Sequence, residues 1–132
     1  MPAGDAFTQR QQEDIVRAIR LADAQAALPV SVYVGTLDAP DGVTRAAAQR
    51  LHAALGEDAA STVLVAVDPG LRRVEIVVAR DLVHRLDDRS CALAAIAMTS
   101  TFQAGDLAGG IVAGINTLAE HTRLPRSLER EA

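Results

Sequence analysis

The sequence contains no lysine and almost no aromatic side chains. All thirteen basic residues are arginine, which excludes Schiff-base catalysis, a P-loop lysine and a Ser–Lys dyad, because each needs a lysine amine. The only aromatic residues are one tyrosine and two phenylalanines, and the formal net charge is −4. A negatively charged chain with so few stacking side chains is a poor binder of single-stranded nucleic acid, so no nucleic-acid partner is expected.

Cysteine and long apolar runs are also scarce. The single cysteine, Cys91, excludes an internal disulfide and fits a reducing compartment. The first residues have neither the basic nor the apolar region of a secretory signal. No apolar run approaches the roughly 20 residues that a membrane-spanning helix requires. The sequence therefore predicts a soluble, cytoplasmic protein with no membrane span.

Four stretches have the apolar spacing and the end signals of helices. They cover residues of about 8–27, 43–55, 87–102 and 107–121. The first of them opens with a T-x-x-Q capping box made by Thr8 and Gln11. In the third, an inward-facing stripe is predicted for four residues: Cys91, Ala95, Met98 and Phe102.

Three stretches have the pattern of strands, at residues 30–34, 62–67 and 73–79. The second is apolar on both faces, which is typical of a central strand covered on both sides. The first and second bracket a helix and should be parallel. The second and third should be antiparallel, because Pro69 and Gly70 occupy the central positions of a predicted type II turn.

This order predicts an α/β fold, a single-domain α/β/α sandwich in which helices cover both faces of a small mixed sheet. The predicted domain covers residues 8–122. An N-terminal arm, residues 1–7, precedes it, and a charged tail, residues 123–132, follows it. The last two helices should meet at a tight junction. Gly105 is placed to end one helix in a left-handed conformation, and Asp106 is placed to cap the next.

Three aspartates are the best candidates for a metal site. Asp38 and Asp41 follow the first strand, and Asp68 follows the second. If these strands are parallel neighbours, the carboxylates gather at one edge of the sheet, where ligands of open α/β sheets commonly bind. Oxygen ligands of this kind suit Ca²⁺ or Mg²⁺. The alternative is that all three are turn and cap residues, and this alternative is favoured because such turns use aspartate for local hydrogen bonds.

Five arginines lie close together in the sequence around the third strand and could receive an acidic partner. They are Arg72, Arg73, Arg80, Arg85 and Arg89.

Three segments carry a resemblance to a known family. They are residues 31–35, residues 63–77 with their Asp68-Pro69-Gly70 turn, and the run Phe102-x-x-Gly105-Asp106-Leu107-x-Gly109-Gly110-Ile111. The chain resembles an actinobacterial family of domains of unknown function, which is itself similar to the TPM domain. TPM domains occur in thylakoid lumen proteins, photosystem II repair factors and MOLO-type receptor modulators. The resemblance covers about residues 7–121 and implies an α/β/α fold with a small mixed sheet.

The resemblance also implies two functions of different class. Some TPM domains are described as weak acid phosphatases that bind a divalent cation, and others as accessory or assembly partners of membrane proteins. The preferred prediction is a non-catalytic interaction module that binds a protein partner through the sheet edge or the basic cluster. The alternative is a divalent-cation-dependent phosphatase that uses Asp38, Asp41 and Asp68. The substrate, the identity of the partner and the oligomeric state are left open.

Overall fold

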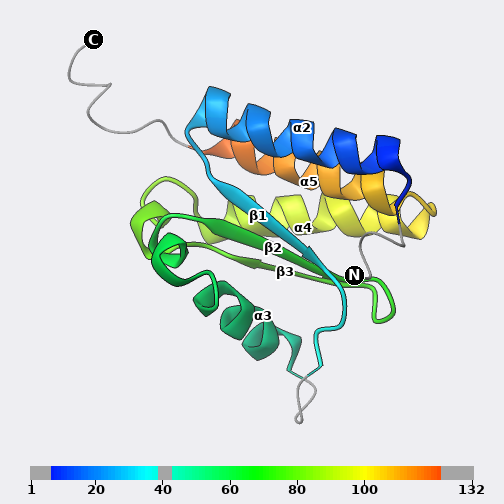
Figure 1. The fold of residues 1–132 in the computed structure, drawn as a ribbon, viewed down its shortest axis with the longest axis horizontal. Coiled ribbons are helices and arrows are strands. Elements are labelled where there is room, and N and C mark those ends of the chain that lie inside the picture. The colour runs from blue at the N-terminus through cyan, green and yellow to red at the C-terminus, as the bar shows by residue number, and fades with distance from the viewer. Residues whose placement is uncertain (1–6, 39–42, 123–132) are drawn as a thin grey trace.

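Three strands form one small mixed sheet at the centre of the fold (Figure 1). The computed structural model describes residues 7–38 and 43–122. The strands are β1 (Val30–Val34), β2 (Val63–Asp68) and β3 (Arg73–Val77), in the order β1-β2-β3. β1 and β2 are parallel, and β2 and β3 are antiparallel, as predicted. Every residue of β2 is buried, which confirms that it is the central strand.

Helices lie on both faces of this sheet, so the predicted α/β class is confirmed (Figure 1). α2 (Gln9–Ala26), α4 (Asp88–Gln103) and α5 (Leu107–His121) form a layer on one face, in which α5 contacts both α2 and α4. α3 (Thr44–Ala53) covers the other face and contacts β2 and β3. Two short 3₁₀ turns, η1 (Gly56–Ala60) and η2 (Arg80–Leu82), complete the described elements.

The two faces bury cores of unequal size. The main core lies between the three-helix layer and the sheet, and its fully buried members include Met98, Ile111, Ile115 and Leu118. Phe7 also packs into it, so the last residue of the predicted arm belongs to the folded domain. The smaller core lies under α3 and consists of Leu37, Ala47, Ala48, Leu64, Ala66 and Val77.

The ends of α2 are fixed by one local and one distant contact. The capping box is confirmed: Gln11 N donates to Thr8 Oγ1 at 3.1 Å, and Thr8 N donates to Gln11 Oε1 at 2.9 Å. At the other end, the Arg85 guanidinium donates to the carbonyls of Ala26 and Ala27, at 2.6 and 3.1 Å. These carbonyls lack a partner within the helix, so a side chain from far along the chain closes the last turn.

The junction between α4 and α5 is also built as predicted. Asp106 N donates to the carbonyl of Thr101 and Gly105 N to that of Phe102, the pair of bonds of a Schellman motif. Gly105 has a φ of 90°, in the region that glycine tolerates best. Asp106 Oδ1 accepts a hydrogen bond from Gly109 N at 2.8 Å and caps α5. Capping therefore accounts for both residues of this conspicuous pair.

Two predictions about local structure were wrong in part. On α4 the buried residues are Ser90, Ala94 and Met98, whereas Cys91 and Ala95 are only half-buried. The stripe is displaced because α5 approaches through its glycines: a Cβ at Gly114 would overlap the Met98 side chain.

The turn between β2 and β3 is not of type II. Gly70 does not have the positive φ that this type requires, and the left-handed residue is Arg72, with a φ of 53°. Asp68 explains the difference, because its Oδ1 accepts from Leu71 N at 3.1 Å and sets the local turn.

Candidate functional site

Asp68 joins the carboxyl ends of β1 and β2 at one edge of the sheet. Its side chain is buried, and Oδ2 accepts a hydrogen bond from Leu37 N at 2.9 Å, while Oδ1 accepts from Leu71 N. One carboxylate therefore fastens the segment after β1 to the hairpin turn. This is the role of a turn residue, extended by a contact that spans 31 residues of sequence.

Asp38 reaches the same edge, because it follows Leu37 directly. It is exposed and lines a shallow hollow of about 250 Å³ between the end of β1 and α3, together with Thr36, Ala47, Arg50 and Leu51. Asp41 lies outside the described residues. Within residues 7–38 and 43–122, no three His, Cys, Asp or Glu side chains lie close enough to hold a metal ion. The structure thus brings Asp38 and Asp68 to one edge, and the trio remains a prediction.

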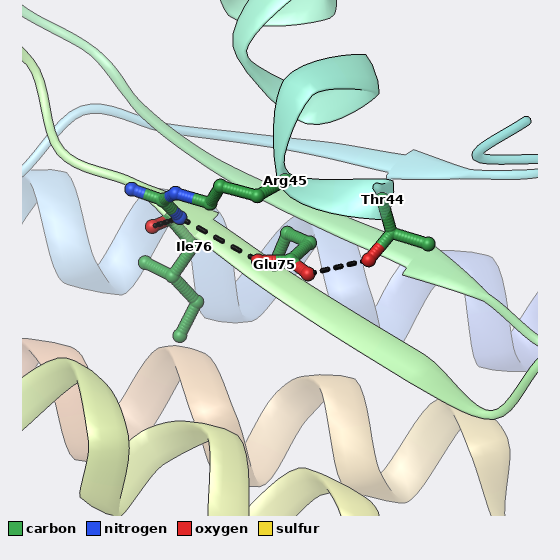
Figure 2. A network of polar contacts seen from close by, with 4 residues as sticks. All are labelled: Thr44, Arg45, Glu75 and Ile76. Atoms are coloured by element: carbon green, nitrogen blue, oxygen red, sulfur yellow. Dashed lines mark hydrogen bonds and ion pairs between the residues drawn. The ribbon is translucent and has the colours of Figure 1, made fainter. Parts of the chain in front are cut away.

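A network of polar contacts lies on the opposite side of the sheet, over β3 (Figure 2). Thr44 Oγ1 donates to Glu75 Oε2 at 2.6 Å, and Arg45 Nη1 lies 3.7 Å from Glu75 Oε1. The same Nη1 donates to the backbone carbonyl of Ile76 at 2.6 Å. Two neighbouring residues at the start of α3 therefore hold both a side chain and a main-chain acceptor of β3.

This network covers an edge of the sheet. β3 has only β2 as a neighbour, and the Ile76 carbonyl points away from β2, since Val77, Glu75 and Arg73 occupy the hydrogen-bonding positions. An outward carbonyl is where another strand would attach, and the Arg45 guanidinium occupies it. Sequence reasoning missed this network. The available signal was Glu75, a charged residue in a strand, where acidic residues are depleted.

The outer edge of β1 is different. Its sequence, Val-Ser-Val-Tyr-Val, carries no charge, and Ser31, Val32 and Tyr33 are each half-exposed. Val63 N donates to the Pro29 carbonyl, and Gly35 N donates to the Val67 carbonyl. Alternate residues of a strand address the same side, so residues 29, 31, 33 and 35 face β2, and the N–H and C=O of Val32 face outward. Within the described residues, β1 has no other strand beside it.

The predicted basic cluster does not form one patch. Arg72 and Arg73 lie at the start of β3, and Arg80 lies beyond its end, so a strand about 14 Å long separates them. Arg80 lies 3.6 Å from Asp81, and Arg85 bonds to the end of α2. Charges so divided cannot act as one receptor for an acidic partner.

Cys91 is not an activated thiol. Burial raises its pKa to about 11, with smaller upward contributions from the negative charges of Asp88 and Asp87. A nucleophilic cysteine needs the opposite shift, because the thiolate is the reactive form.

Among the residues that the structure describes, no helix is both long enough and apolar enough to cross a membrane.

The fold and its surfaces define a small α/β domain with one guarded and one open sheet edge. The chain belongs to the family described as Domain of unknown function (DUF5130), which matches residues 2–119. No curated protein matches the chain.

Solved structures share the fold. The BA42 protein of the psychrophilic bacterium Bizionia argentinensis is 21% identical, with a TM-score of 0.74 over 92% of this chain and 87% of that one. The N-terminal domain of the cg2496 protein of Corynebacterium glutamicum is 19% identical, with a TM-score of 0.68 over 89% of this chain and 74% of that one. The N-terminal domain of a P. gingivalis protein is also 19% identical, with a TM-score of 0.67 over 90% and 82%. At these identities the likeness shows the fold alone, and no catalytic function is indicated.

Proposed function

We propose that this domain is a non-catalytic interaction module that binds an extended segment of a protein partner along the outer edge of β1. The observation that carries the proposal is the contrast between the two sheet edges. Arg45 occupies the outward carbonyl of β3, whereas the middle of β1 is uncharged and half-exposed. Natural proteins guard sheet edges against unwanted pairing, so an unguarded edge beside a guarded one favours a use for it.

The chemistry of the edge selects the occupant. The outward N–H and C=O of Val32 offer one donor and one acceptor in the spacing of a β-ladder, and an extended segment presents the matching groups. Main-chain hydrogen bonds of this kind give affinity, and the neighbouring side chains give specificity. On this face Ser31 and Tyr33 are half-exposed, and the hollow beside Asp38 and Arg50 continues from the end of β1.

The accessory role also agrees with the resemblance to TPM domains, some of which assist other proteins. Kinship with TPM domains and an actinobacterial origin remain predictions from the sequence. The lone Cys91 supports the predicted cytoplasmic location, because secreted domains of this size often carry disulfides.

The test is capture of the partner with matched proline variants. Val32→Pro removes only an outward N–H, and proline is tolerated on an edge strand in that position. The matched control is Val74→Pro on β3, since Val74 also lies between residues that bond to β2. A partner captured by the wild type and by Val74→Pro, but lost with Val32→Pro, supports the proposal. A partner bound equally by all three proteins contradicts the assignment to β1.

A second arm tests whether the domain is catalytic. The wild type is expected to show no metal-dependent turnover of p-nitrophenyl phosphate with Ca²⁺ or Mg²⁺ at millimolar concentration. Clear turnover that depends on either cation would overturn the non-catalytic assignment.

The alternative proposal is the divalent-cation-dependent phosphatase. The hydrogen bond between Leu37 N and Asp68 Oδ2 favours it, because this bond brings Asp38 and Asp68 to one edge. Calorimetry should then detect Ca²⁺ or Mg²⁺ binding that Asp38→Ala or Asp68→Ala weakens. Asp38→Ala is the cleaner variant, since Asp68 also holds two backbone amides. A flat titration with both cations would remove this alternative.

A further inference from the structure

The outward face of α4 is the longest uncharged surface on the described helices. No charged residue occurs in the sixteen positions from Ser90 to Gly105. Ile96 is 62% exposed and Leu93 is 42% exposed, and they lie on the same face because they are three residues apart. Since α5 and the sheet contact the other side of α4, no described element covers this face.

We propose that this face binds a second copy of the chain, with two α4 helices antiparallel and a two-fold axis at Ile96. The exposed positions of α4 from Arg89 to Gln103 are centred on Ile96, seven residues from each end. A two-fold interface brings one surface against itself, so its central residue must tolerate contact with its own copy. Ile96, the most exposed large apolar side chain of the described residues, meets that condition.

The two halves of the face are complementary in size. The half before Ile96 carries Leu93 beside Ala92, and the half after it carries Thr99 and Ser100. In the antiparallel arrangement each Leu93 meets Thr99 and Ser100 of the second copy. A large apolar side chain therefore packs over small ones on both sides of the axis, which allows the helices to approach closely.

The charges at the two ends are complementary as well. The last turn of α4 has no basic residue to balance the negative end of its dipole. In the antiparallel pair, Arg89 of each copy lies beside Gln103 of the other and places a guanidinium at that end. This complementarity selects a second copy over an apolar partner that lacks a cation in the corresponding position.

α2 provides the contrasting case. It also exposes two large apolar side chains, Val16 and Leu21, each 43% exposed. Charged residues, Arg17 and Arg20, lie between them in the sequence, and Glu13 and Asp14 precede them. Exposure alone therefore does not single out α4; the unbroken uncharged face and its symmetry do.

The contact is a pair of single helices, which places it below the about 1,200 Å² of a stable interface and in the weak class. The experiment is sedimentation of the full chain between about 10 µM and 1 mM. The weight-average mass should rise with concentration from 13.8 kDa toward twice that value. A mass that stays at 13.8 kDa throughout would overturn the proposal.

Two substitutions of the same kind locate the interface. Ile96→Glu places two carboxylates together at the axis and should leave the chain monomeric at every concentration. The matched control, Val16→Glu, should follow the wild-type curve. If both variants associate like the wild type, α4 is not the interface.

A further variant keeps this inference separate from the proposed function. Val32→Pro alters only the β1 edge and should also follow the wild-type curve. If Val32→Pro abolishes the association, the copies pair through β1 and the assignment to α4 is wrong. Circular dichroism of each variant verifies folding, and an Ile96→Cys disulfide, formed faster than a Val16→Cys disulfide in a Cys91→Ala background, would locate the axis independently.

Discussion

β1 and β3 are the two outermost strands of one sheet, and each pairs only with β2, yet their outer edges differ. β3 carries Glu75 within the strand, and Thr44 and Arg45 of α3 hold its side chain and the outward carbonyl of Ile76 (Figure 2). β1 carries no charge, and its middle is half-exposed. Packing of the core requires neither arrangement. The comparison teaches that edge protection is applied selectively, at β3 and not at β1.

The largest expected effect tests which backbone groups of β1 face outward. Tyr33→Pro removes an N–H that faces β2, leaves a buried carbonyl of β2 without its donor, and deletes the phenol ring. We expect the free energy of unfolding in urea to fall by about 3 kcal/mol or more. Val32→Pro should cost less than about 1 kcal/mol, because its N–H has no ladder bond to lose. Equal losses for the two variants would show that the alternation is assigned wrongly.

An intermediate effect tests the guard on β3. Arg45→Ala removes the hydrogen bond to the Ile76 carbonyl, and we expect a loss of about 1 kcal/mol in urea denaturation. The ion pair with Glu75 adds little, because the Arg45 side chain is 46% exposed. The variant should also associate at high concentration through the uncovered edge, which light scattering would detect in an Ile96→Glu background. Arg50→Ala, on the exposed side of the same helix, is the control and should stay within about 0.5 kcal/mol of the wild type.

The smallest effect uses Cys91, near the start of α4, as a reporter of the guarded edge. Burial raises the pKa of its thiol from 9.0 to about 11. A shift of two units means about 100-fold less thiolate at pH 8 than in the unfolded chain, so alkylation should be slower by about that factor. The Arg45 charge opposes the shift, and Arg45→Ala should slow alkylation further. Rapid alkylation of the native protein would contradict this placement of the thiol.

The same pKa fixes the direction of a pH effect. Because the neutral thiol is favoured in the folded state, its contribution to stability is complete below about pH 9 and is lost as the pH rises toward 11. The difference in unfolding free energy between the wild type and Cys91→Ala should therefore change over this interval and remain constant below it.

Local signals predicted much of this fold. The capping box of Thr8 and Gln11 and the Gly105-Asp106 junction each depend on residues within a few positions of one another, and both were predicted correctly. The central position of β2 followed from its two apolar faces. These features need no knowledge of tertiary structure.

Contacts between distant residues were beyond such signals. The turn after β2 was predicted as type II because Pro69 and Gly70 fit that type, but the Asp68 carboxylate determines the turn and also binds Leu37 N. The buried side of α4 depends on glycines of α5 that remove side chains from the contact. The sequence predicted binding at a sheet edge without indicating which edge, because the Arg45 contact with β3 spans 31 residues.

The pairing of α2 with α5 has a consequence for synthesis of the protein. α2 is the first helix to leave the ribosome, and its main helical neighbour, α5, is the last. The apolar side of α2, including Ile15, Ala18 and Ala22, therefore has no helix to pack on until residues of about 107–121 have been translated. The nascent chain carries this surface exposed through most of its elongation, and closure of the main core is a post-translational step.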